Sequence, residues 1–323
     1  MGYGIGAAIT WAFDTVILSI ALSCSAFFET EQAIALASLT STFLHDGASA
    51  VFAFIFMAVR GKLKQTKDLL VSKYGKYIVI AAVIGAPLGM TGYVTSIANI
   101  GPAYTAAITA FFPAYGAALA HFVLKEPMRG YNWAGLIVCL IAVAVLGWSP
   151  AEGIPGNWVV GIIGCLICVV GWGTEAVIIA WGLKSAQVDD QCAMQIRQTT
   201  SAITYALVIM PIVGGWGCSI DAFLSDAMPW IALAALSGTV SYLLYYKAIA
   251  VIGAAKSMAL NITYSAWAIP FSLVFLGSMP DARGIICAVV IIVGAIVAAT
   301  DVKALFTKGD TSGTELERFE QPL

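Results

Sequence analysis

Two short motifs pair a tryptophan with an acid three positions later: Trp11 with Asp14, and Trp172 with Glu175. Residues three apart lie on the same face of a helix. A quaternary ammonium ion cannot donate strong hydrogen bonds, so it is held by a nearby negative charge and by aromatic faces, each contributing about 0.5–2 kcal/mol. The two motifs therefore indicate a site for a small organic cation.

Other aromatic residues are candidates for the walls of this site. When the sequence is placed over itself at a shift of 152 positions, Tyr93 overlies Tyr245 and Tyr115 overlies Trp267. A second interpretation stays open, in which the two acids hydrogen-bond to neighbouring helices and the aromatic side chains only pack. The candidate substrate-binding residues are Trp11, Asp14, Trp172, Glu175, Tyr93, Tyr115, Tyr242, Tyr245, Tyr264 and Trp267.

The composition indicates that these motifs lie in a lipid bilayer. Of the 323 residues, 60% are hydrophobic and 11% are charged, with a mean hydropathy of +0.90, whereas soluble domains have about 45–50% apolar and about 25% charged residues. An ionised carboxylate at the bilayer centre costs about 2.5–3.5 kcal/mol, so Asp14 and Glu175 are expected to face a cavity. The net charge of −2 argues against a nucleic-acid partner.

Four titratable residues are candidates for carrying a proton, because desolvated acids and histidines can titrate: Glu175, Asp14, His45 and Asp46. His45 and Asp46 are adjacent in the sequence, so they are expected on different faces of a helix, each with a hydrogen bond to another helix as the simpler role. Arg197 lies a few residues inside an apolar segment and is expected to extend toward the cytoplasm.

The cysteines give no sign of a metal or redox centre. Cys165 and Cys168 form a Cys-x-x-Cys motif, but the segment around them is apolar and uncharged and contains no second pair. We therefore expect no disulfide, no metal and no other cofactor.

Windows of apolar residues predict an all-α membrane protein with ten spanning helices, since a span takes about 20 residues. The connections between them are short and marked by glycine, proline or charge. The expected spans are about 4–26, 33–59, 77–98, 102–124, 131–149, 157–181, 193–214, 229–251, 254–277 and 284–306.

The distribution of basic residues predicts that both termini are cytoplasmic. With that orientation, twelve Lys and Arg residues lie on the cytoplasmic side, six of them in residues 60–76, and only Arg283 lies on the other side. This agrees with a multi-pass protein of the cytoplasmic membrane. Residues 309–323 are polar and are expected to form a disordered tail.

The two halves of the chain resemble each other. TWAFDTVI (10–17) overlies GWGTEAVI (171–178), which places Trp11 over Trp172 and Asp14 over Glu175. Five spans in each half would give the halves opposite orientations across the membrane. We therefore expect a 5+5 inverted repeat, with residues 1–150 as the first five-helix repeat and 151–308 as the second.

The sequence resembles the drug/metabolite transporter superfamily of the EamA type. The resemblance rests on ten spans, cytoplasmic ends, the repeat of five, and the Glu126-Pro127 turn after the fourth span. Within it, the Trp-x-x-acid pairs and intramembrane aromatic residues look like the choline permeases of bacterial phosphorylcholine (lic-type) systems. The resemblance implies a DMT/EamA fold with a central cavity that opens alternately to either side, and uptake of choline or a related quaternary ammonium.

The sequence also allows functions other than choline uptake to be considered. The alternative within the same superfamily is an exporter of amino acids, amines or drugs. An intramembrane enzyme is disfavoured, because the sequence has no His-Glu-x-x-His and no Gly-x-Ser-x-Gly motif. A monomer and a homodimer are both compatible with the sequence, as are proton coupling and uncoupled diffusion.

Overall fold

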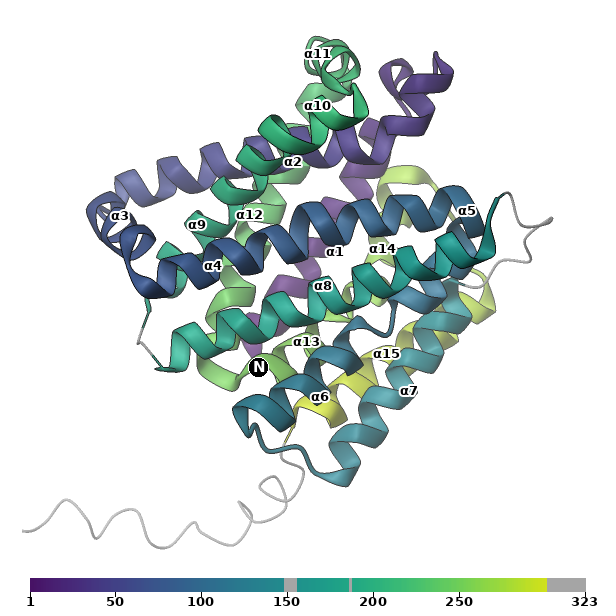
Figure 1. Ribbon diagram of the computed structural model, residues 1–323. Coiled ribbons are helices and arrows are strands. Elements are labelled where there is room, and N and C mark those ends of the chain that lie inside the picture. Colours follow the sequence, from purple (N-terminus) through teal and green to yellow (C-terminus); the bar gives the residue numbers. More distant parts are fainter. Residues whose placement is uncertain (148–155, 186–187, 301–323) are drawn as a thin grey trace, which may run out of the picture.

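The computed structural model describes residues 1–147, 156–185 and 188–300, and within these ranges every regular element is a helix (Figure 1). The expected polar tail, residues 309–323, and the end of the last expected span lie outside the described residues. Long helices run side by side, and many of their outward side chains are large and apolar, as lipid contact requires.

The helices of the first half cover the five expected spans, although one helix runs through the expected connection between the third and fourth spans. They are α1 (Gly2–Leu22), η1 (Ser25–Phe27), α2 (Glu31–Val59), α3 (Leu63–Val71), α4 (Lys73–Val83), η2 (Ile84–Leu88), α5 (Gly89–Thr109), α6 (Phe112–Leu124) and α7 (Gly130–Gly147). Those of the second half are α8 (Trp158–Ser185), α9 (Asp190–Thr204), η3 (Tyr205–Ile209), α10 (Met210–Val213), α11 (Trp216–Phe223), α12 (Ala227–Ile252), α13 (Ala254–Asn261), α14 (Tyr264–Leu276) and α15 (Ala282–Ala299).

Eight helical stretches of the described chain are long and apolar enough to cross a membrane, where the sequence predicts ten. The two remaining expected spans contain shorter apolar helices, Phe112–Leu124 and Gly130–Leu146. The first is short because the chain is not helical between α5 and α6, so that the expected span 102–124 is divided. The expected span 131–149 ends outside the described residues.

The expected spans 102–124 and 254–277 are not continuous helices, and their breaks are displaced by the same 152 positions. Gly101 and Gly253 both adopt the left-handed region, with φ of 80° and 87°, which glycine occupies without the steric cost that a Cβ brings. A second break lies inside each of the two expected spans, and the helix after it starts at Phe112 in one half and at Tyr264 in the other. Both of these helices then end at a residue with positive φ, Lys125 or Gly277.

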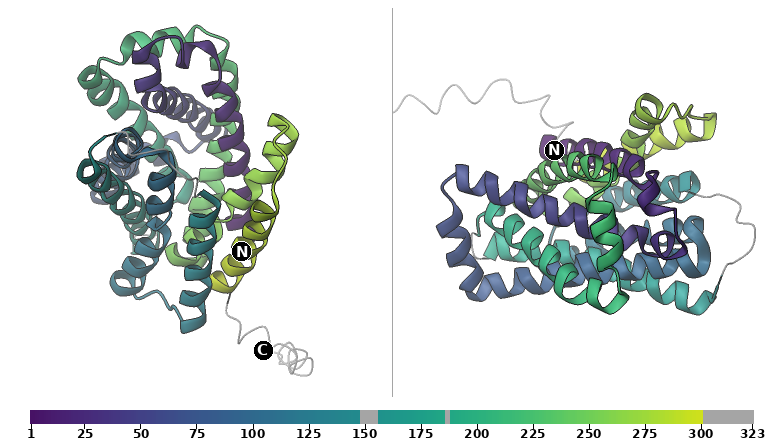
Figure 2. Two further views of the ribbon diagram at one scale, coloured as in Figure 1. Left: turned by 90° about the vertical axis from the view of Figure 1, so that its right-hand side faces the viewer. Right: turned by 90° about the horizontal axis from the view of Figure 1, so that it is seen from above.

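The helix packing also has corresponding contacts in the two halves. α1 packs against α12 and α14, while α8 packs against α5 and α6. α7 packs against α15, and α2 against α9. In the left view of Figure 2, α14 and α15, in yellow-green and yellow, lie along one edge of the bundle beside the purple α1. These contacts bring the middle of α1 and of α8 toward the centre of the molecule.

The turn that contains Glu126 stabilises one of the helix breaks. Glu126 is buried, and its two carboxylate oxygens accept hydrogen bonds of 3.0 Å each from the backbone N–H groups of Ala254 and Ala255, at the start of α13. Lys184 donates to the same carboxylate at 2.8 Å. The negative charge therefore satisfies the first N–H groups of α13 and lies at the positive end of its dipole.

A second contact between the halves involves Asp189, directly before α9. Its carboxylate accepts from the backbone of Gln191 and Cys192 and lies 2.6 Å from the Nζ of Lys62. Partial burial opposes ionisation of Asp189, but the hydrogen bonds from Lys62 and Cys192 outweigh it and hold the pKa of the carboxyl below its usual value.

Candidate functional site

A cavity of about 240 Å³ lies at the centre of the helix bundle. Its walls come from both halves of the chain and combine aromatic rings with five ionisable side chains. The residues that line it are Trp11, Asp14, Thr15, Leu18, Thr42, His45, Asp46, Ala86, Met90, Phe112, Trp172, Glu175, Ala176, Ile179, Arg197, Ser241, Tyr242, Tyr245, Tyr246, Ile249, Asn261 and Tyr264.

Most residues that the sequence singles out lie on this cavity. Of the ten candidate substrate-binding residues, seven line it: Trp11, Asp14, Trp172, Glu175, Tyr242, Tyr245 and Tyr264. His45 and Asp46, candidates for carrying a proton, line it as well. Both Trp-x-x-acid motifs therefore face the same space, although they are 161 positions apart.

Three candidates do not line the cavity. Tyr93 lies behind Trp172, with ring centroids 5.8 Å apart and an interplanar angle of 31°. Tyr115 has its hydroxyl 3.4 Å from the hydroxyl of Thr174. Trp267 lies on α14, one turn after Tyr264, and is partly exposed. Tyr93 and Tyr115 thus pack against α8 behind the lining residues.

The α1 motif is positioned by close packing against α12. The ring of Trp11 meets that of Tyr242 edge-on, at a centroid distance of 5.3 Å and 87°. Gly238 lies opposite Asp14, where a Cβ would stand only 2.8 Å from Oδ2 of Asp14 and 2.9 Å from Nε2 of His45. The absence of a side chain at Gly238 therefore makes the room in which Asp14 and His45 meet.

The α8 motif is positioned by glycines of the third span. A Cβ at Gly85 would collide with the carboxylate of Glu175, and one at Gly89 would stand 3.0 Å from the indole of Trp172. Gly85 belongs to η2, a π-helical turn that contains Pro87. The edge of Phe112 completes the contact with Trp172, at a centroid distance of 5.3 Å. The site is thus shaped by small residues that let helices approach closely.

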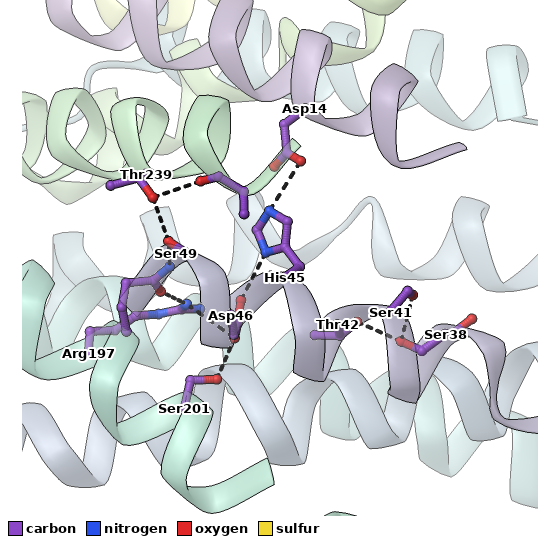
Figure 3. A network of polar contacts seen from close by, with 12 residues as sticks. Asp14, Ser38, Ser41, Thr42, His45, Asp46, Ser49, Arg197, Ser201 and Thr239 are labelled. Atoms are coloured by element: carbon purple, nitrogen blue, oxygen red, sulfur yellow. Dashed lines mark hydrogen bonds and ion pairs between the residues drawn. The ribbon is translucent and has the colours of Figure 1, made fainter. Parts of the chain in front are cut away.

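A chain of ionisable groups runs along one wall of the cavity, and Figure 3 shows it. Nε2 of His45 lies 3.2 Å from Oδ1 of Asp14, and Nδ1 of His45 lies 3.2 Å from Oδ1 of Asp46. Ser201 donates to the other oxygen of Asp46. His45 and Asp46 face different helices, as expected: His45 reaches Asp14 of α1, and Asp46 accepts a hydrogen bond from Ser201 of α9. Their side chains also contact each other.

Arg197 joins the same wall from α9, and the expectation that it extends to the cytoplasm is wrong. Its side chain is buried and its Nε donates to Oε1 of Glu175 at 2.8 Å. The guanidinium also donates to Gln198 and lies 3.8 Å from Asp46. Its Cζ stands 4.3 Å from the centre of the Tyr242 ring.

Some polar atoms of the cavity wall are left without a hydrogen bond. Among the described residues, the Tyr246 hydroxyl has no partner, although Tyr246 is only 2% exposed. Oδ1 of Asp14 and Nε2 of His45 face each other at 3.2 Å but do not meet hydrogen-bond geometry. Leaving a buried polar group unpaired costs about 1–3 kcal/mol. The wall therefore has hydrogen-bonding capacity available for a guest.

Comparison with known proteins supplies the context for this geometry. The model of the EamA-like transporter family matches residues 1–148 and again residues 159–300. The chain belongs to the EamA-like transporter family. It is therefore a multi-pass membrane protein of the drug/metabolite transporter superfamily, and the central cavity lies within the fold of that family.

Individual relatives agree with this family. The chain is 32% identical over 190 residues to Protein LicB of Haemophilus influenzae, an alignment covering 59% of this chain and 63% of the relative. It is 26% identical over 182 residues to an uncharacterized transporter of Clostridium kluyveri, covering 55% and 57%. Both alignments span less than two thirds of the relative's length. A solved crystal structure shares the fold with a TM-score of 0.66 at 17% identity, covering 91% of this chain and 96% of the other.

Proposed function

We propose that this EamA-like transporter is a secondary transporter of the cytoplasmic membrane that takes up choline or a related quaternary ammonium through the central cavity. The observation that carries the proposal is the convergence of both Trp-x-x-acid motifs on one aromatic, acid-containing cavity. Aromatic faces with a nearby carboxylate suit an ammonium ion that has no strong hydrogen-bond donors. The resemblance to lic-type choline permeases and the similarity to Protein LicB support it.

The size of the cavity favours a small cation over a drug-sized molecule. Pockets for drug-sized ligands enclose roughly 300–1,000 Å³, and the cavity here encloses about 240 Å³. A quaternary ammonium with a short substituent, such as choline, suits the smaller space. The size therefore supports the cation over the broad drug substrates of the exporter alternative.

The charges of the wall also favour a cation. Three carboxylates, Asp14, Asp46 and Glu175, line the cavity, against one guanidinium and one imidazole. Asp14 is the carboxylate with the fewest partners: among the described residues its ion pair with His45 is not a hydrogen bond, whereas Glu175 accepts one from Arg197 and Asp46 accepts one from Ser201. Asp14, beside Trp11, is therefore the acid that we assign to the substrate's ammonium group, and a carboxylate of the substrate would be repelled.

In this proposal the two halves form an inverted 5+5 repeat with both termini in the cytoplasm, residues 1–150 and 151–308. Support comes from the helix breaks at Gly101 and Gly253 and from the paired packing contacts. Discontinuous helices at a repeat interface are typical of transporters whose halves move against each other around a fixed site. The cavity would then open alternately to either side, in a monomer or a homodimer.

We also assign proton coupling to the ionisable side chains of the cavity wall: if uptake is driven by protons, these groups carry them. Asp14, His45, Asp46 and Glu175 lie within one connected network that reaches the cavity. An imidazole placed between two carboxylates can hold a proton for either. Substrate and proton would then meet at Asp14.

The proposal is tested by measuring thermal stabilisation of the purified protein with a panel of choline, betaine, carnitine and amino acids. We expect stabilisation by choline and less or none by the carboxylate-containing ligands, because a bound ligand stabilises the state that binds it. The absence of any choline-induced shift contradicts the proposal. A broad response to amines and amino acids would favour the exporter instead.

A further inference from the structure

Arg197 already contacts the two kinds of group that would bind an ammonium ion, a carboxylate and an aromatic ring. Its guanidinium pairs with Glu175 at 2.8 Å and lies over the Tyr242 ring at 4.3 Å. The side chain is buried and comes from α9, seven positions after that helix begins at Asp190. An acid and an aromatic face of the cavity are therefore already in contact with a cation that belongs to the protein.

Glu175 is placed so that Arg197 is its counterion. Oε1 accepts from Nε of Arg197, and the η2 turn with Gly85 packs directly against the same carboxylate. Opening this pair to admit a second cation would leave a buried guanidinium without its partner, and breaking a buried pair is strongly unfavourable. The equivalent acid in the first half, Asp14, has no guanidinium beside it and faces the imidazole of His45, which lies between Asp14 and Asp46.

We propose that Arg197 is a specificity-determining residue, a tethered cation that fills the Glu175–Tyr242 subsite and leaves the Asp14–Trp11 subsite as the one place for a substrate's ammonium group. This inference rests on the proposed function. It implies that the pseudo-symmetric cavity, which has two Trp-x-x-acid motifs, takes one positive charge rather than two. Glu175 then acts through Arg197 and does not touch the substrate.

The charges of the wall agree with this division. With Arg197 paired to Glu175, the carboxylates of Asp14 and Asp46 remain, with His45 between them at 3.2 Å from each. A proton on His45 leaves one net negative charge, which a monovalent cation balances. Without Arg197, the same wall would carry one negative charge more and would favour a dication.

A charge-removal cycle tests the inference on purified full-length protein. The variants are Glu175→Gln, Arg197→Gln and the double variant, and the ligands are choline and bis(trimethylammonio)ethane, a compact dication. Glu175→Gln removes the carboxylate that lies 2.8 Å from Arg197 and leaves only the more distant Asp46, at 3.8 Å, to balance the guanidinium. The excess positive charge is expected to weaken choline binding by about tenfold or more. The double variant removes both charges and is expected to regain most of that loss, a coupling of the size seen between residues in contact.

Binding of the dication measures the specificity of the cavity for one positive charge over two. Arg197→Gln is expected to improve the affinity for the dication relative to choline by about tenfold, because one negative charge is uncovered. When Asp14→Asn is added to the double variant, choline binding is expected to be abolished. This loss would show that choline binds at the Asp14 subsite in the double variant. Thermal unfolding of each variant accompanies the binding data. Where a single variant fails to fold, the double variant carries the test, since a buried ion pair replaced by neutral groups is generally tolerated.

The outcomes separate this inference from the proposed function. If the wild type binds choline and the folded double variant binds it as weakly as Glu175→Gln, then Glu175 itself holds the substrate and the inference is overturned. An unchanged preference between choline and the dication in Arg197→Gln also overturns it. If the wild type binds no choline, the proposed function fails first, and the inference fails with it.

Discussion

Asp14 and Glu175 hold matching positions in the two motifs, yet their carboxylates have different surroundings. Glu175 is paired with a buried guanidinium, whereas Asp14 faces an imidazole across 3.2 Å. The sequence shows the match of the acids but not this difference. It depends on Arg197, which lies a few residues inside an expected span and thus resembles a residue at the membrane surface. Because α9 begins at Asp190, Arg197 is two turns inside the helix and its side chain is held in the interior.

The Tyr246 hydroxyl provides a residue-scale prediction. It is buried at the cavity and has no hydrogen-bond partner among the described residues, so we expect it to bind the hydroxyl of choline. Tyr246→Phe should weaken choline binding by about three- to tenfold, the range for a single hydrogen bond. Tetramethylammonium, which has no hydroxyl, should lose less than about twofold.

Binding of both ligands is measured by calorimetry on the wild type, Tyr246→Phe and the control Tyr77→Phe, whose ring packs on Trp181 away from the cavity. An equal loss for choline and tetramethylammonium would show that Tyr246 contributes packing rather than a hydrogen bond.

At the scale of elements, hydropathy predicts most of the helices because the membrane requires about 20 apolar residues per span. The breaks within two of the spans are less visible. Gly101 and Gly253 are found by the repeat, but the second breaks fall at 110–111 and 262–263, where no glycine or proline stands. Pro113, in the first turn of α6, lacks the backbone N–H that would continue α5 and so marks the first of these breaks, but no glycine or proline stands beside the second. The π-helical turn at Ile84–Leu88 is indicated by Pro87 and its flanking glycines.

The capping of α13 by Glu126 provides an element-scale prediction. Glu126→Ala removes two backbone hydrogen bonds at the start of α13 and should lower the free energy of unfolding by about 1–2 kcal/mol, the usual cost of losing a helix cap. Thermal unfolding in detergent measures it. The control Glu29→Ala, at an exposed position, should stay within about 0.5 kcal/mol of wild type. Equal effects of the two substitutions would contradict the capping role.

Close packing at Gly238 gives a second prediction at this scale. Gly238→Ala places a Cβ within 3 Å of both Asp14 and His45, and overpacking of this kind costs typically about 1–3 kcal/mol. We expect lower thermal stability together with at least about tenfold weaker choline binding. Gly182→Ala serves as the control, since a Cβ there meets open space. Normal choline binding by Gly238→Ala would show that the Asp14–His45 contact is not required.

At the scale of the whole molecule, composition predicts the bilayer and the repeat predicts a cavity where the halves meet. The ion pairs between Lys62 and Asp189 and between Lys184 and Glu126 join one half to the other. Both lie on the side that the basic residues mark as cytoplasmic. The sequence could not show these pairs, because each depends on how two segments far apart in the chain are placed against each other.

The orientation is predicted by the same basic residues. In intact cells, an impermeant maleimide should label Met279→Cys, which is 80% exposed, and should not label Lys67→Cys until the membrane is opened. The background is a variant in which the partly exposed Cys24 and Cys218 are replaced by serine; the other five cysteines are buried. If Lys67→Cys were labelled in intact cells and Met279→Cys were not, the predicted orientation would be wrong and the termini would lie outside the cytoplasm.

Uptake of labelled choline into vesicles that contain the purified protein tests the central claim most directly. The comparison is between the wild type, Asp14→Asn, and the control Asp226→Asn, an exposed acid at the start of α12 that makes no side-chain cap. We predict saturable uptake by the wild type and by the control, and a loss of at least about tenfold in Asp14→Asn, because the carboxylate is the charge that we assign to the ammonium group. Absence of uptake by the wild type, or wild-type uptake by Asp14→Asn, would contradict the account.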